Sequence, residues 1–160
     1  MYPFRKLAVW EKAHRLTLRV YSATDGVSSR RFPGLASQLR RSVASIPANI
    51  AEGAGYASQA QFNRFLEIAL ASAREADYHL LLAKDLELMS AKEYAYLEAR
   101  LSEVQAMLMG LRKRLLEKLR SSSERPANEG ETRRGGRKAS PLTSPISDQQ
   151  LGKEPRREHQ

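Results

Sequence analysis

Residues 90–115 read SAKEYAYLEARLSEVQAMLMGLRKRL, and this stretch carries the pattern that decides the fold. A repeat of about 3.5 residues between large apolar side chains is the seam of a helix in a left-handed bundle. Ser90, followed three residues later by Glu93, is a capping box that predicts where the helix begins. The side chains that form the repeat are Tyr94, Leu97, Leu101, Val104, Leu108, Leu111 and Leu115.

The preceding segment predicts a second long helix that runs back along the first. Ser58 and Gln61 form another capping box, and an apolar face follows from Phe62. No helix breaker occurs before about Met89, so only a short link separates this helix from the next. Two long helices joined by a short link must be antiparallel neighbours.

Two more helices are predicted before residue 56. The first stops at Asp25-Gly26, and the second begins near Pro33, which suits a first helical turn, and ends at Gly53 and Gly55. We expect Pro47 to bend the second helix, because proline lacks an N–H donor and clashes with the preceding turn. The sequence therefore predicts an all-α protein, an antiparallel four-helix bundle.

The chain divides at about residue 120. All aromatic residues lie at or before Tyr96, whereas residues 121–160 are rich in Pro, Gly, Ser and charge. A segment with so few large apolar residues cannot offset the entropy lost on ordering. We expect a bundle domain over residues 1–120 and a disordered, basic C-terminal tail over residues 121–160.

Composition restricts the class of protein. The chain has no cysteine, which excludes disulfides, thiolate catalysis and cysteine-ligated metal sites. No uncharged stretch approaches the roughly 20 apolar residues of a membrane span, and Glu11 and Lys12 interrupt the start that a secretion signal would need. We expect a cytoplasmic protein with no membrane partner.

The net charge of +9 belongs mainly to the predicted bundle, where residues 1–120 hold 19 Lys and Arg against 12 Asp and Glu, a net +7. This excess allows attraction to RNA, DNA or an acidic protein, and is equally common in basic proteins that bind none of them. Cations also stabilise a helix C-terminus, which is a second explanation for the cluster from Arg112 to Arg120 at the end of the fourth predicted helix. The candidate nucleic-acid-binding residues are Arg30, Arg31, Arg40, Arg112, Lys113, Arg114, Lys118 and Arg120.

A line of polar side chains borders the apolar stripe of the second helix. At about 100° per residue these side chains share one narrow arc, so we expect part of the line to be buried. A buried arginine needs a carboxylate, and two are available, Glu75 of the third helix and Glu52. The line either forms a polar network that fixes helix register or provides a surface for a subunit or RNA. Its members are Gln38, Arg41, Ser45, Asn49 and Glu52, with Glu75 facing them.

No residue pattern supports catalysis. The histidines His14, His79 and His159 are far apart, and no Glu-x-x-His pair supports a di-iron bundle site. We therefore expect no enzymatic activity, no cofactor and no metal site. The opposing hypothesis is a metal-dependent nuclease that uses Glu52 and Glu75.

The chain resembles the four helix bundle protein family, also described as the family encoded by intervening sequences of bacterial 23S rRNA genes. The family patterns Gln-x-Arg-Arg and Ser-Ile-x-x-Asn-Ile-Ala-Glu-Gly match residues 38–53, and Phe-x-x-Phe-Leu-x-x-Ala and Ser-x-x-Glu match residues 62–75. The opening FRKLAVWEKAHR, residues 4–15, is also similar to the family's start. The resemblance covers about residues 4–115. One departure is Glu87, which follows Leu86 where the family has a Leu-Gly turn.

The resemblance implies a non-enzymatic bundle that assembles as a closed homo-oligomer, with a pentamer expected. A distant similarity to accessory proteins of diversity-generating retroelements, which bind nucleic acid and a reverse transcriptase, favours association with RNA or DNA. The alternative is a protein–protein interaction scaffold that binds no nucleic acid. Tyr56, Tyr78 and Tyr96 also favour self-association, because tyrosine is enriched at interfaces and a heterologous contact closes a ring.

Overall fold

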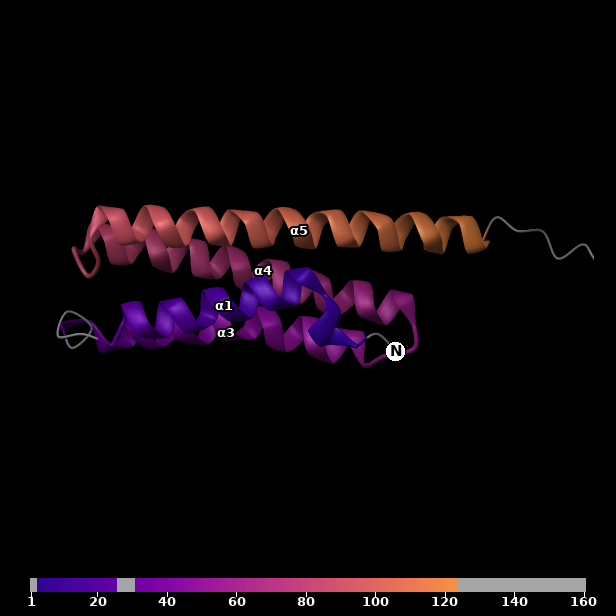
Figure 1. The fold of residues 1–160 in the computed structure, drawn as a ribbon, viewed down its shortest axis with the longest axis horizontal. Coiled ribbons are helices and arrows are strands. Elements are labelled where there is room, and N and C mark those ends of the chain that lie inside the picture. The colour runs from indigo at the N-terminus through magenta and orange to yellow at the C-terminus, as the bar shows by residue number, and fades with distance from the viewer. Residues whose placement is uncertain (1–2, 26–30, 124–160) are drawn as a thin grey trace, which may run out of the picture. The chain divides into compact units, whose positions relative to one another are not determined.

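The computed structural model describes residues 3–25 and 31–123. These residues form a short 3-10 helix η1 (Phe4–Lys6) and four α-helices, with no strand among them (Figure 1). The helices are α1 (Ala8–Ala23), α3 (Pro33–Ala54), α4 (Gln59–Asp85) and α5 (Ala91–Ser123). The prediction of an all-α four-helix bundle is confirmed. Arg30 and residues 124–160 of the predicted tail lie outside the described residues.

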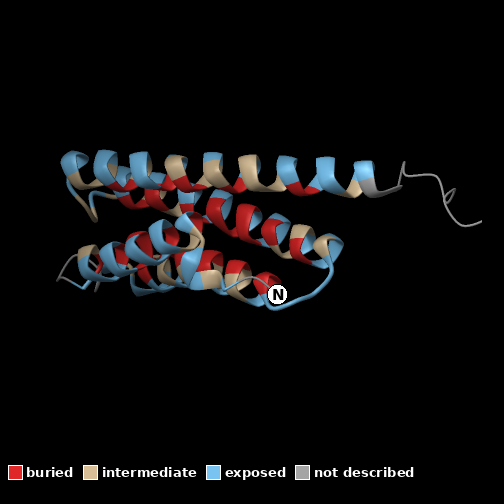
Figure 2. Cartoon of the chain, turned by 45° about the vertical axis from the view of Figure 1, so that its right-hand side comes forward, coloured by how far each residue is buried: buried red, intermediate tan, exposed pale blue. Residues whose placement is uncertain are grey.

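The helices alternate in direction, and each packs against two neighbours in the cyclic order α1, α3, α4, α5 (Figure 1). Their apolar faces meet in one core, which Figure 2 shows as buried faces turned toward the interior. The seam of α5 lies in this core as predicted, with Leu97, Leu101, Val104 and Leu108 at 1 % exposure or less. None of the described helices is long and apolar enough to cross a membrane.

The predicted helix starts agree with the structure. The Ser58 hydroxyl oxygen accepts a hydrogen bond from the Gln61 amide at 3.4 Å, and Ser90 accepts one from the Glu93 amide at 3.2 Å. Pro33 is the first residue of α3. The predicted end of α3 also agrees with the structure, because Ala54 is its last residue and Gly55 is its C-cap. Gly53 therefore lies inside the helix, where its missing side chain has a packing role.

The turn between α4 and α5 places a glutamate in a glycine position. Glu87 has φ of 57°, the left-handed region. Its amide donates to the Lys84 carbonyl oxygen at 2.9 Å, and the Leu88 amide donates to the Ala83 carbonyl oxygen at 2.8 Å. These two bonds form a Schellman motif, which usually has glycine at this residue. The departure at Glu87 thus falls on the residue whose backbone most favours glycine.

The hydroxyl of Thr17 in α1 lies within hydrogen-bond distance of a carbonyl oxygen of α3 that has no helical donor because of Pro47. Pro47 has no N–H, so the carbonyl oxygen of Val43 lacks its helical hydrogen bond. The hydroxyl of Thr17 lies 3.0 Å from this oxygen and 2.9 Å from the Ala13 carbonyl oxygen of its own helix. All of these groups are buried between α1 and α3, so the hydroxyl connects the two helices.

Candidate functional site

The structure divides the polar line of α3 into a packed part and an exposed part. In the packed part, the Asn49 amide donates to the Ser45 hydroxyl oxygen at 2.9 Å and to the Ser45 carbonyl oxygen at 2.8 Å. The Ser45 hydroxyl lies 2.9 Å from the Ser72 hydroxyl of α4. Because Ser45 accepts from Asn49, its own proton is available to Ser72. This chain of hydrogen bonds connects α3 to α4.

The exposed part of the line makes its side-chain contacts within single helices. Arg41 is exposed, and its guanidinium donates to the side-chain oxygen of Gln38 at 2.7 Å, one turn earlier in the same helix. Glu75 is also exposed and lies 3.5 Å from His79 in its own helix. Arg41 is therefore not the member of the line that is buried, and it forms no ion pair with either available acid, Glu75 or Glu52. Arg41, Gln38 and Glu52 all face solvent.

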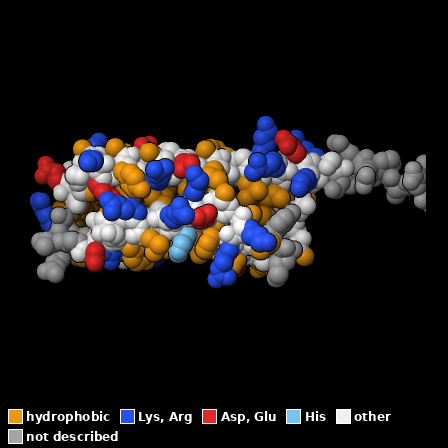
Figure 3. All heavy atoms as spheres, viewed as in Figure 1, with side chains coloured by type: hydrophobic (Ala, Val, Ile, Leu, Met, Phe, Trp, Pro, Cys, Tyr) orange, Lys and Arg blue, Asp and Glu red, His pale blue; other side chains and the backbone are white. Residues whose placement is uncertain are grey.

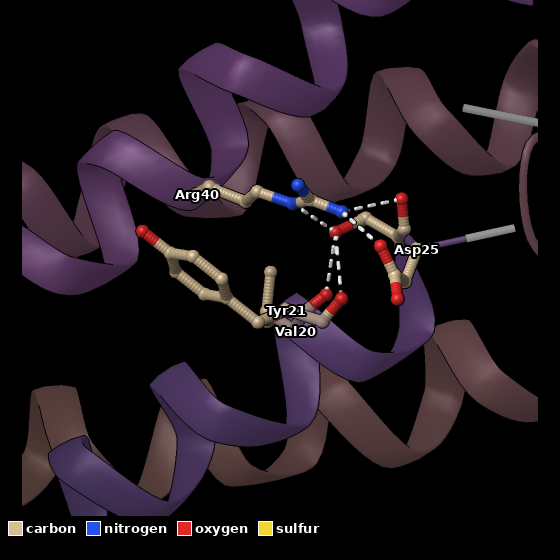
Figure 4. Close-up of polar contacts among 5 residues, drawn as sticks. Val20, Tyr21, Asp25 and Arg40 are labelled. Atoms are coloured by element: carbon tan, nitrogen blue, oxygen red, sulfur yellow. Dashed lines mark hydrogen bonds and ion pairs between the residues drawn. The ribbon is translucent and has the colours of Figure 1, made fainter. Parts of the chain in front are cut away.

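Arg40 has a structural position at the end of α1 (Figure 4). Its guanidinium donates to the Thr24 hydroxyl at 2.8 Å and to the Thr24 carbonyl oxygen at 2.7 Å, and it lies 3.7 Å from the Asp25 carboxylate. The same group lies 5.3 Å from the centre of the Tyr21 ring. A cation beside the last carbonyls of a helix is favoured by the helix dipole. Arg40 thus holds α3 against the C-terminus of α1.

The basic cluster of α5 also contains one packed residue. Arg112 forms an ion pair with Glu67 of α4, and its Nε donates to the Asn63 side-chain oxygen at 3.2 Å. Lys113 and Arg114 are exposed, and among the described residues neither has an ion-pair partner. Lys118 and Arg120 of the same cluster are exposed as well. Arg31, which precedes α3, is also exposed.

A cationic groove between α1 and α5 was not predicted from the sequence. Lys12, Arg15 and Arg19 line it from α1, and Tyr96 and Arg100 line it from α5. Figure 3 shows Lys and Arg side chains along the boundary of these two helices. The basic side of the first helix was visible in the sequence, but nothing there indicated which helix would face it.

Carboxylates of α5 pair with cations of α1 along this groove. Lys12 of α1 pairs with Glu103 of α5, and Arg19 donates to Glu93 at 2.6 Å. The hydrogen bond from Lys12, with further support from Arg100, lowers the pKa of Glu103. The ion pair between Lys12 and Glu103 is therefore present at neutral pH. It is lost only when acidification protonates the Glu103 carboxylate.

The described residues contain no group of three His, Asp or Glu side chains that could hold a metal ion. Glu52 and Glu75, the carboxylates of the nuclease hypothesis, are both exposed. Together with the fold, these features define a class of protein: a basic, all-α bundle in which the polar line joins two helices through Ser45 and Ser72, and in which Lys113 and Arg114 face solvent.

The chain belongs to the 23S rRNA-intervening sequence protein family, whose model matches residues 5–110. Among solved structures, it is similar to a protein of unknown function from the S23 ribosomal protein family of Bacteroides thetaiotaomicron. That match has 28 % identity and a TM-score of 0.62, and it covers 66 % of this chain and 95 % of the other. No curated protein matches the chain.

Proposed function

We propose that this protein is a non-enzymatic, nucleic-acid-binding bundle that acts in the cytoplasm as a closed homo-oligomer. The observation that carries the proposal is the exposed pair Lys113 and Arg114, which packing leaves available while it engages Arg112. The net charge of +7 over residues 1–120 would attract a polyanion from a distance. The family's name refers to an intervening sequence of 23S rRNA, which makes RNA the first ligand to test.

Exposed apolar side chains support self-association. Tyr78 of α4 is 61 % exposed, Leu18 of α1 is 58 % exposed and Met109 of α5 is 51 % exposed. Surfaces of this kind on identical chains are covered when the chains associate. A ring would also repeat each basic cluster around its axis and thereby raise the avidity for a long polyanion.

Light scattering at micromolar concentration tests the assembly. We expect a single species at a multiple of the 18.0 kDa chain mass, about 90 kDa for a pentamer. A particle of one chain mass at all concentrations would contradict the closed oligomer.

Charge reversal at Lys113 and Arg114 tests nucleic-acid binding. We expect Lys113→Glu with Arg114→Glu to weaken RNA binding about tenfold or more, since two phosphate contacts become repulsive. Arg112 is left unchanged because it connects α5 to α4. The matched control is Arg64→Glu with Arg74→Glu, two exposed cations of α4. Circular dichroism should show unchanged helix content in both variants.

The outcomes separate the two candidate functions. Equal loss in both double variants would indicate a non-specific charge effect and contradict a role for this cluster. An assembled protein that binds no RNA or DNA at low salt would favour the interaction scaffold. Metal-dependent cleavage of RNA that Glu52→Gln abolishes would overturn the non-enzymatic assignment.

A further inference from the structure

We infer that the groove between α1 and α5 binds single-stranded nucleic acid, with its cations on the phosphates and Tyr96 stacked on a base. This inference rests on the proposed function and deepens it, because it names a second site and the form of nucleic acid that fits there.

The groove continues along the seam between the two helices. The hollow lined by Lys12, Arg15, Arg19, Tyr96 and Arg100 shares Glu103 with a second hollow between the start of α1 and the C-terminal half of α5. Apolar side chains such as Leu7 and Met107 line the second hollow, and Arg114 is among its residues. From Tyr96 to Arg114 the seam is about 27 Å long at 1.5 Å per residue. A strand lying along it would meet cations in both hollows.

The paired cations of the groove retain donors for a phosphate. A guanidinium has five N–H groups, and a lysine ammonium has three. Arg15 contacts Glu11 through one nitrogen at 2.5 Å, and Arg100 approaches Glu103 through one nitrogen at 3.6 Å. The side chains of Arg15 and Arg100 are 76 % and 55 % exposed, so their remaining donors face water. Four cations meet three carboxylates here, namely Glu11, Glu93 and Glu103, which leaves an excess of positive charge.

Tyr96 gives the groove a stacking surface. Its residue is 47 % exposed, and the guanidinium carbons of Arg19 and Arg100 lie 5.7 and 5.3 Å from its ring centre. Bases of single strands stack on aromatic rings and on guanidinium planes, and a basic groove with an aromatic residue is the usual arrangement in proteins that bind them. The bases of a duplex are stacked on each other and cannot reach such a ring, which is why the geometry favours a single strand.

The same ion pairs could serve only to hold α1 against α5, and the choice of variants separates these roles. Lys12 and Arg19 pair across the two helices, so replacing them would also weaken the bundle. Arg15 pairs within α1, and Arg100 pairs within α5. Removing the charges of Arg15 and Arg100 should therefore change ligand binding without separating the helices.

The experiment measures the affinity of the full chain for a fluorescently labelled RNA of about 15 nucleotides, single-stranded or in a duplex, over a salt series. Arg15→Gln with Arg100→Gln should make the negative slope of log K against log salt shallower by about 1.4 for the single strand. Tyr96→Leu should weaken single-strand binding roughly 5- to 150-fold and affect the duplex less. Arg64→Gln with Arg74→Gln on α4, which does not contact α1, should leave both nearly unchanged.

Each result decides between the groove and the proposed function on which it rests. Wild-type protein that binds RNA with an affinity unchanged by the groove variants, but reduced by Lys113→Gln with Lys118→Gln, would overturn the groove and keep the proposed function. Wild-type protein that binds neither form at low salt would overturn both. If the groove variants lose as much free energy of unfolding as they lose free energy of binding, these residues act in packing, and the inference is also overturned.

Discussion

Replacing Gly53 by alanine should destabilise the bundle by about 1–3 kcal/mol, although glycine to alanine inside a helix ordinarily stabilises by about 0.5–1 kcal/mol. A Cβ at this position would lie 2.6 Å from the Cβ of Phe65 and 2.9 Å from a ring carbon of Phe62. The Phe65 atom is fixed to the backbone of α4, and Phe62 is 2 % exposed, so neither can move at low cost. The helices α3 and α4 would have to separate locally.

Gly110→Ala is the matched control for this prediction. Gly110 also lies inside a helix, and apart from the nearby backbone of that helix a Cβ there would have no heavy atom within 4 Å. We expect that variant to be slightly more stable than wild type, by up to about 1 kcal/mol. Urea unfolding followed by circular dichroism measures both variants. The two variants should change stability in opposite directions, so a Gly53→Ala protein as stable as Gly110→Ala would refute the close approach of α3 and α4.

Thr17→Val should cost about 1–3 kcal/mol, because it leaves the buried carbonyl oxygen of Val43 without a donor. The cost should fall in a Pro47→Ala background, where the new amide N–H of residue 47 can donate to Val43 within the helix. A double-mutant cycle measures this dependence as a coupling free energy, which we expect to be about 1 kcal/mol.

Ser42→Ala provides the control for the cycle. Ser42 is buried in the same helix, but its hydroxyl donates to the Leu39 carbonyl oxygen at 3.0 Å. Its replacement should add to Pro47→Ala within about 0.5 kcal/mol. If Thr17→Val and Pro47→Ala are equally additive, Thr17 does not compensate for the proline.

Much of the fold could be predicted from the sequence because local patterns dictate it. Ser58 and Ser90 marked helix starts, and the repeat ending at Leu115 marked the buried face of α5. The sequence indicated Gly53 as part of the end of α3, but not its close packing against Phe62 and Phe65. Glycine supports either role, and only the position of the neighbouring helix distinguishes them.

The candidate site was less predictable, because its residues depend on which helices become neighbours. Arg41 is exposed and donates a hydrogen bond to Gln38, one turn earlier in the same helix, and not to a carboxylate of α4. Arg40 acquired its role from Thr24, at the end of a different helix. The groove that joins Arg15 to Tyr96 combines residues about 80 positions apart, and each helix face alone reads as an ordinary solvated surface. Periodicity predicts the face of a helix but not its neighbour.

The measurement that most directly tests the central claim is the affinity of the full, unmodified chain for single-stranded RNA as a function of salt. If exposed cations bind phosphates, log K should fall linearly with log salt, with a slope of about −0.7 for each phosphate neutralised. A protein that engages Lys113, Arg114 and the groove cations Arg15 and Arg100 should show a slope of about −3 or steeper. Absence of binding at low salt, or an affinity independent of salt, would contradict the proposal that this family member recognises nucleic acid.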